Sequence, residues 1–332
     1  MTLIDPSSEP VVGFLEANGF APELQSLRLE GSHRRYFRCH KTSNNASAVL
    51  CIENPYIPEN HDFLSIQQQL NQASIPVPEI LALDAQHGLM LQSDGGSRDL
   101  QTWMDSDSTA TDEAIESHYL QLVDIILLMQ SLPVKPPVST RSFDKEKLHW
   151  EMEFLYERLE KVQESRGINV VPSFELKMFL LEMCEALSTY DNQCFVHRDF
   201  HSRNVMLHNG NVTIIDFQDA RFGNRYYDLA SLLFDPYVNL TPALRKKCVD
   251  HYFDKAGLEK GRGTLYLQGL QRILKALGSY LYLSLELNKT SYLECVEKAL
   301  NQLEVCLHLG RFPDSVFLFI LDCKKKLLPA LK

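Results

Sequence analysis

The sequence predicts an α+β protein of two lobes, with a small mixed β-sheet lobe at residues 1–95 and a larger helical lobe at residues 96–332. Three observations lead to this prediction. Short runs of β-branched and aromatic residues, separated by polar turns, fill the first lobe. Two adjacent glycines then follow at 95–96, where a hinge between a strand and a helix forms easily. Beyond them, most of the chain has the apolar spacing of amphipathic helices.

The first lobe contains five predicted strands and one helix. Residues 60–73 have apolar side chains at 63, 66 and 70, the spacing of one helical face. Pro76 and Pro78 end this helix, because proline lacks the backbone donor that a helix requires. The predicted strands cover residues 27–29, 36–39, 48–52, 80–83 and 89–91.

The second lobe is predicted to be a helical array with one interruption. Ser173 is a suitable N-cap for a helix that runs to about residue 190. The segment 197–219 interrupts the array with a loop, a strand and a second loop. The other predicted helices cover residues 112–131, 144–164, 242–256, 264–288, 290–309 and 315–328.

Composition excludes several classes of protein. Apolar residues make up 45% of the chain, so a globular core is expected. With 33 basic against 43 acidic residues, the net charge of −10 argues against a nucleic-acid partner. No apolar run approaches the roughly 20 residues of a membrane span, and the acidic start is not a signal peptide, so no membrane partner and a cytoplasmic location are expected. Nothing in the sequence specifies an oligomeric state.

The eight cysteines are scattered and mostly lie within apolar segments. None forms a Cys-x-x-Cys pair. Reduced, buried thiols are therefore expected rather than disulfides or zinc ligands.

The segment 197–219 has the residue types that phosphoryl transfer from ATP requires. Asp199 is followed five residues later by Asn204, and Asp216 comes after a Val-Thr-Ile-Ile strand. Such transfer needs a carboxylate beside the attacking hydroxyl and oxygen ligands for Mg²⁺. Asp199 is therefore the predicted catalytic base, and Asn204 and Asp216 are the predicted metal ligands. His197 is expected to organise the loop through hydrogen bonds.

Three further stretches carry a family resemblance. They are Ile-Asp-Phe-Gln-Asp-Ala-Arg at 215–221, Tyr-Asp-Leu-Ala-Ser-Leu-Leu at 227–233 and Leu-Gln-Arg-Ile-Leu-Lys-Ala-Leu-Gly at 270–278. Together with the segment above, they resemble the aminoglycoside phosphotransferase and choline kinase superfamily, which has a bilobal protein-kinase-like fold. The narrower resemblance is to bacterial N-acetylmuramate/N-acetylglucosamine kinases, which phosphorylate the anomeric hydroxyl. It extends from about residue 32 to about residue 280.

The resemblance implies roles for further residues. Asp219 would be an additional metal or water contact, and Asp228 would support the catalytic loop by accepting backbone hydrogen bonds. The implied ATP-phosphate contacts are Ser32, His33, Arg34 and Arg35. The implied acceptor contacts are Glu151, Glu153 and Asp235.

One departure from the kinase pattern concerns phosphate binding. The third predicted strand, Val-Leu-Cys-Ile-Glu-Asn-Pro, lacks the lysine that kinases use there, and the helix at 60–73 has no glutamate to pair with it. Either Arg34, Arg35 or Arg38 supplies the missing cation, which is the interpretation we favour, or phosphate binding is weak.

A basic helical face lies in the second lobe. Arg272 and Lys275 share this face, which would suit an acidic pocket wall or an anionic substrate.

These observations support one leading function and two alternatives. The leading hypothesis is an ATP- and Mg²⁺-dependent kinase of N-acetylmuramate and N-acetylglucosamine that recycles cell-wall sugars, with a small molecule as its partner. The first alternative keeps the chemistry but changes the acceptor to an aminoglycoside, choline or a similar alcohol. The second is a nucleotide-binding pseudokinase, which the missing strand lysine favours and the three site residues oppose.

Overall fold

The pairing of two short strands that are far apart in the sequence determines which residues form the first structural unit. The computed structural model describes residues 3–27, 34–54, 56–189 and 193–331. In it, β6 (Arg98–Asp99) pairs antiparallel with β8 (Val205–His208). Sequence periodicity is a local property and cannot reveal a pairing between distant strands. The predicted first lobe therefore covers only the continuous stretch of residues 1–95. The first unit consists of Met1–Asp99 and Val205–Gln218, and the second of Leu100–Asn204 and Asp219–Lys332.

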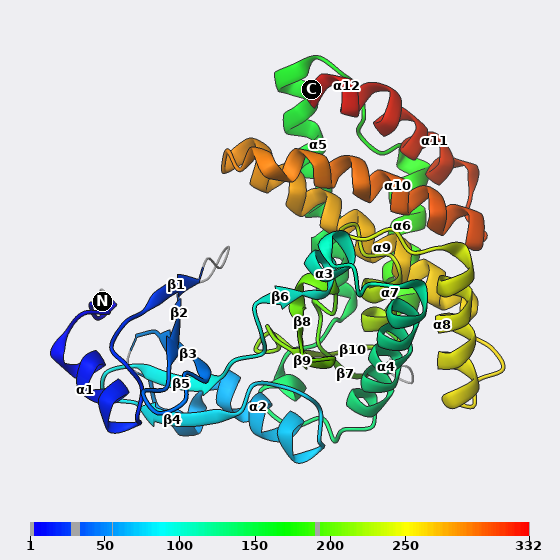
Figure 1. Cartoon of the computed structure of the whole chain (residues 1–332). Helices are drawn as coiled ribbons and strands as arrows, with labels where there is room; N and C mark the ends of the chain where they lie inside the picture. The colour runs from blue at the N-terminus through cyan, green and yellow to red at the C-terminus, as the bar shows by residue number, and fades with distance from the viewer. Residues whose placement is uncertain (1–2, 28–33, 55, 190–192, 332) are drawn as a thin grey trace. The chain divides into compact units, whose positions relative to one another are not determined.

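The first unit is built on a five-stranded sheet with the order β1-β2-β3-β5-β4 (Figure 1). Each neighbouring pair is antiparallel. The strands lie within a few residues of their predicted positions, and the second half of the predicted strand at 27–29 lies outside the described residues. Their bounds are β1 Gln25–Leu27, β2 Arg35–His40, β3 Ser47–Ile52, β4 Ile80–Asp84 and β5 Leu89–Ser93.

One face of this sheet packs against α1 (Glu9–Ala17), a helix that the sequence analysis does not predict. Val11 and Leu15 of α1 join the buried side chains of the central strands, among them Phe37 and Leu50, in one apolar cluster. The first unit also contains α2 (Asp62–Gln72), the predicted helix of this lobe, which buries Phe63, Ile66 and Leu70.

The hairpin of β8 and β9 (Asn211–Ile214) completes the first unit. Its turn residues Asn209 and Gly210 both have positive φ, at 50° and 78°, as a tight two-residue hairpin turn requires. Directly after β9, Asp216 also has a positive φ of 66°. The side chain of Phe217 stacks on Phe63 of α2, which fixes the chain on the C-terminal side of Asp216.

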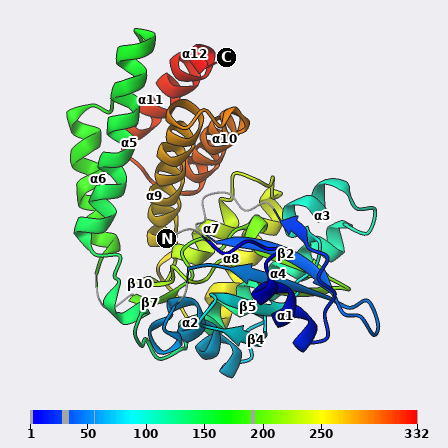
Figure 2. The same cartoon turned by 90° about the vertical axis from the view of Figure 1, so that its left-hand side faces the viewer.

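The second unit is mainly helical, as predicted, and α9 (Arg262–Leu281) is its central element (Figure 2). Helix α9 is buried on almost every side because α5, α6, α7 and α10 pack around it. The α+β fold class predicted from the sequence is confirmed. No helix within the described ranges has both the length and the apolarity of a membrane span.

The helix bounds agree with the predicted ranges to within a few residues for most elements. Helices α3, α7 and α12 and the strands β6, β7, β8 and β10 were not predicted, and the predicted helix at 264–288 ends earlier and continues as a π-helical turn. The bounds are α3 Leu100–Ser106, α4 Asp112–Gln130, α5 Lys145–Arg166, α6 Phe174–Leu187, α7 Tyr227–Leu233, α8 Pro242–Lys255, α10 Leu293–Leu309, α11 Asp314–Asp322, α12 Leu328–Leu331, β7 Gln193–Val196 and β10 Arg221–Asn224.

Candidate active site

The loop that carries Asp199 is held by a buried carboxylate. It follows β7, and Asp228 of α7 accepts hydrogen bonds from the backbone N–H groups of His197 and Arg198, at 2.7 and 3.0 Å. Burial raises the pKa of Asp228 to about 7, although the two backbone donors act in the opposite direction. Arg198 has a positive φ of 83°, so these bonds stabilise an unfavourable backbone conformation. This geometry matches the supporting role expected for Asp228.

A second carboxylate holds the far end of the same loop. Asp235 is buried and accepts hydrogen bonds from the backbone and hydroxyl of Ser202, at 2.8 and 2.6 Å, and from the backbone of Tyr237 at 2.8 Å. The Asn204 side chain donates to the Asp199 carbonyl at 2.9 Å. Asp235, predicted as an acceptor contact, therefore has its carboxylate directed at the loop that it supports.

Asp199 itself is surrounded by cations. Its Oδ1 accepts a hydrogen bond from Arg272 at 2.9 Å and lies 3.8 Å from the Lys275 ammonium, while Oδ2 lies 3.8 Å from Arg198. Burial favours the neutral acid, but Lys275, Arg272 and Arg198 outweigh it and hold the pKa of Asp199 well below its usual range. Because 24% of the Asp199 side chain is exposed, the carboxylate remains accessible as well as charged.

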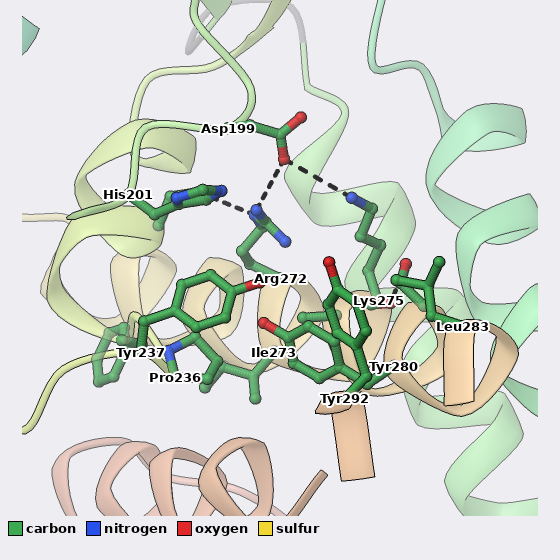
Figure 3. A pocket seen from close by; sticks show the side chains of 14 residues that line it. Asp199, His201, Pro236, Tyr237, Arg272, Ile273, Lys275, Tyr280, Leu283 and Tyr292 are labelled. Carbon is green, nitrogen blue, oxygen red and sulfur yellow. Dashed lines mark hydrogen bonds and ion pairs between the residues drawn. The ribbon is translucent and has the colours of Figure 1, made fainter. Parts of the chain in front are cut away.

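A cavity lies beside Asp199 within the second unit (Figure 3). One helical face of α9 forms its main wall, with Arg272 and Lys275 nearest the carboxylate. Beyond these two cations lie the tyrosine rings, and Figure 3 shows them on the side away from Asp199. The cavity lining also includes His201, Ser231, Phe234, Pro236, Tyr237, Ile273, Ala276, Ser279, Tyr280, Leu283 and Tyr292.

Arg272 connects this cavity to the fold. Its Nε donates to the Ser231 hydroxyl on α7 at 2.9 Å, and its Nη2 donates to Asp199. The guanidinium also lies 5.9 Å from the centre of the Tyr227 ring. With its donors fixed on two sides, Arg272 is a positioning residue for Asp199.

The two predicted acceptor contacts on α5 lie in different environments. Glu151 is 2% exposed and accepts a hydrogen bond from Gln271 at 2.8 Å. Glu153 is half-exposed and lies 3.4 Å from His149 on the same helix. Neither is among the described residues that line the cavity.

The predicted phosphate contacts belong to the first unit, and Ser32 and His33 lie outside the described residues. The Arg34 guanidinium is 2.5 Å from one oxygen of Glu53, whose other oxygen is 2.8 Å from His61. Arg34 also lies 5.7 Å from the centre of the Phe63 ring. The strand that lacks a lysine is thus followed directly by a glutamate, Glu53, and this glutamate pairs with an arginine.

The other two candidate arginines, both on β2, are engaged elsewhere. Arg35 donates to the carbonyl of Ile4. Arg38 forms a two-point ion pair with Asp94, at 2.5 and 3.1 Å. Among the three candidates, only Arg34 lies beside the Phe63–Phe217 stack, and Phe217 directly follows Asp216.

The predicted metal ligands occupy exposed or half-buried positions. Asp216 is exposed and accepts a hydrogen bond from Gln218 at 2.6 Å. Asp219 instead lies 3.2 Å from Arg198 and 3.7 Å from Arg141, so its contacts in the second unit are with arginines. Carboxylate and amide oxygens such as those of Asp216 and Asn204 are ligands that Mg²⁺ prefers.

Sequence reasoning did not assign the tyrosines of the cavity or Arg198 to the site. Arg272, Ala276 and Tyr280 follow one another at intervals of four residues on α9, the spacing of a single helical face, which was a usable signal. Tyr237 comes from a different segment, and no local pattern connects it to α9.

The family model described as "Phosphotransferase enzyme family" matches residues 23–264. The chain belongs to this family. It is therefore a phosphotransferase, and the predicted family resemblance is confirmed.

Relatives and solved structures agree with this assignment. The N-acetylmuramate/N-acetylglucosamine kinase of Pseudomonas putida is 27% identical, over 89% of this chain and 86% of the relative. The protein of the same name from Neisseria meningitidis is 25% identical, over 85% and 84%. In fold, the phosphotransferase resembles choline kinase LicA from Streptococcus pneumoniae, with a TM-score of 0.58, 11% identity and coverage of 90% and 98%. It also resembles Plasmodium vivax ethanolamine kinase, with a TM-score of 0.56, 12% identity and coverage of 88% and 83%.

Replacing Arg272 by methionine tests its positioning role in this phosphotransferase. We expect kcat to fall roughly 10- to 100-fold, because Asp199 loses the hydrogen bond that orients it. Lys275 and Arg198 remain, so the pKa of Asp199 should stay low and the carboxylate should persist as the pH falls to about 5. The pH dependence of kcat/KM measures this.

Arg262→Met provides the control, since Arg262 is an exposed arginine on the same helix that pairs with Asp250. It should leave kcat near the parent value. A new loss of activity in R272M between pH 5 and 7 would contradict a positioning role and show that Arg272 acts through its charge.

Proposed function

We propose that this phosphotransferase transfers the γ-phosphoryl group of ATP to the anomeric hydroxyl of N-acetylmuramate or N-acetylglucosamine. The observation that carries the proposal is the cavity beside Asp199, which combines a charged carboxylate, two cations and several tyrosines. The names of the relatives, which align over most of both chains, support the same acceptors. Recycling of cell-wall sugars would supply such acceptors.

The cavity suits a sugar because its parts match those of a pyranose ring. Aromatic faces such as those of Tyr237 and Tyr280 pack against the apolar C–H surface of a sugar, while polar side chains bond its hydroxyls. Asp199 would accept a hydrogen bond from the reacting hydroxyl, align it with the phosphoryl group and take its proton as the new P–O bond forms. Arg272 would keep Asp199 in the orientation for this transfer.

The charge of the cavity argues against the alternative acceptors. Choline and aminoglycosides are cations. Arg272 and Lys275 both lie within 4 Å of Asp199 and outnumber its single negative charge. A cationic acceptor at this carboxylate would therefore meet net repulsion.

ATP and Mg²⁺ are the cofactors that this proposal requires. We assign Asp216 and Asn204 to the metal and Arg34 to the phosphates, with Glu53 and His61 orienting the guanidinium in place of the usual lysine–glutamate pair. Mg²⁺, when bound, neutralises charge on the phosphates. The Arg34–Glu53 pair is also our reason for preferring an active kinase to a pseudokinase.

An acceptor panel tests this function. With MgATP, we expect ADP release with N-acetylmuramate or N-acetylglucosamine and none above background with choline or kanamycin. Coupled spectrophotometric detection of ADP gives the rates. ADP release with choline or kanamycin but with neither amino sugar would reject the proposed acceptors and leave a different small-molecule kinase.

A further inference from the structure

Lys275 is a cation of the cavity whose hydrogen-bonding capacity is unused. It lies on α9, one turn after Arg272, and 17% of its side chain is exposed. Its ammonium is 3.8 Å from Asp199, which is beyond hydrogen-bond distance, and it forms no hydrogen bond with any described residue. An ammonium has three donors, so this half-buried lysine has donors available for a ligand in the cavity.

Arg272 provides the contrast. Its Nε and Nη2 donate to Ser231 and to Asp199, both at 2.9 Å. Arg272 is thus a structural cation, whereas Lys275 only borders the same carboxylate. The hydrogen bond that positions Asp199 does not need Lys275.

The surroundings of Asp199 also have an excess of positive charge. Arg272 and Lys275 both lie within 4 Å of this carboxylate, the only one among the described residues that line the cavity. Arg198 is also 3.8 Å from it but lies closer to Asp219, at 3.2 Å. Glu151 is the other nearby anion that favours the charged form of Lys275, and its Oε2 already accepts from Gln271. The whole protein has a net charge of −10, so a local excess of positive charge in this cavity favours an anionic ligand there.

The neighbours of Lys275 indicate which anion this is. On the side of the cavity away from Asp199, Lys275 is followed by tyrosine rings, among them that of Tyr280 from the same helix (Figure 3). Such a wall suits a sugar ring better than a triphosphate chain. A sugar whose anomeric hydroxyl contacts Asp199 would carry the substituent on C3, two ring carbons away, close to that hydroxyl. In N-acetylmuramate this substituent ends in a carboxylate, and in N-acetylglucosamine it is a hydroxyl.

We propose that Lys275 binds the carboxylate of an acidic amino-sugar acceptor and makes the enzyme prefer N-acetylmuramate to its neutral analogues. The inference rests on the proposed function and adds the residue that sets acceptor specificity. The contact is a charge-assisted hydrogen bond between the ammonium and the carboxylate, made inside a cavity where water screens it poorly.

Lys275→Met tests the proposal through a ratio of rates. We expect the kcat/KM of N-acetylmuramate, divided by that of its uncharged methyl ester, to fall by about 10- to 100-fold relative to the parent enzyme. Any effect of the substitution on Asp199 applies to both compounds and cancels in the ratio. Most of the change should appear in KM for the acid. N-acetylglucosamine serves as a second neutral reference.

Two controls keep the test decisive. Lys275→Arg retains the charge and should recover most of the preference for the acid, and Lys260→Met removes an exposed lysine of the same unit and should leave the ratio unchanged. In the parent enzyme, the methyl ester removes the charge of the substrate instead of that of Lys275. A double-mutant cycle that combines the ester with K275M isolates the interaction between the ammonium and the carboxylate.

An unchanged ratio in K275M would overturn the proposal. An equal loss of activity with the acid and with both neutral compounds leaves this ratio unchanged, so it would overturn the proposal as well. Failure of the proposed function would look different, since the parent enzyme would then phosphorylate neither amino sugar.

Discussion

Replacing Asp199 by alanine should lower kcat by roughly 10²- to 10⁴-fold while MgATP binding survives. The substitution removes the group that orients and deprotonates the acceptor hydroxyl. It also leaves Arg272 and Lys275 facing each other without their shared anion, so some loss of thermal stability is expected. Single-turnover kinetics measures the loss of phosphoryl transfer. The rise in Tm on addition of MgATP measures separately whether nucleotide binding survives.

Two further variants make the result specific. Asp199→Asn keeps the side-chain shape and should be impaired to a similar degree, because the amide cannot accept the proton. Asp254→Asn removes an exposed carboxylate from α8 and should retain parental kcat. Turnover of D199A within tenfold of the parent would show that Asp199 is not the base.

Replacing Asp216 by alanine should remove the Mg²⁺-dependent part of nucleotide binding. In the parent, the rise in Tm with ATP should be larger when Mg²⁺ is present, because a ligand that binds only the folded state stabilises it. In D216A the two rises should be equal, and kcat should fall at least as far as in D199A, since charge on the phosphates is no longer neutralised.

Differential scanning fluorimetry with ATP, with and without Mg²⁺, gives the comparison. Asp84→Asn is the matched control, since Asp84 is a carboxylate of the same unit that pairs with His87. It should keep the Mg²⁺-dependent rise in Tm. Persistence of that rise in D216A would mean that another residue binds the metal.

The sequence predicted those parts of the molecule that local patterns determine. The apolar spacing of α4 and the short apolar run of β3 gave their bounds to within a residue or two. The Val-Thr-Ile-Ile run before Asp216 predicted strand β9, but β8, its hairpin partner across the Asn209–Gly210 turn, was not predicted. Helix α1 was missed although Ser8 and Pro10 mark its beginning.

What the sequence could not supply was the direction of side chains that meet across distant segments. Asp235 follows the segment that carries Asp228, yet its carboxylate is directed at Ser202, which only the fold reveals. Lys275 and Asp199 are far apart along the chain and come together only through the packing of α9. Periodicity assigned Lys275 to a helical face, but it could not identify what that face contacts.

The position of the transferred phosphate tests the central claim most directly, namely that Asp199 activates the anomeric hydroxyl of an amino sugar. We would incubate the enzyme with MgATP and N-acetylmuramate, locate the phosphate by phosphorus–proton correlated NMR, and repeat the reaction with the methyl glycoside. Asp199 acts only on a hydroxyl held within about 3 Å, so blocking that oxygen should abolish the reaction. The expected product is an acid-labile, alkali-stable C1 phosphate, with no turnover of the methyl glycoside. A phosphate at any other position, or phosphorylation of the methyl glycoside, would contradict this account.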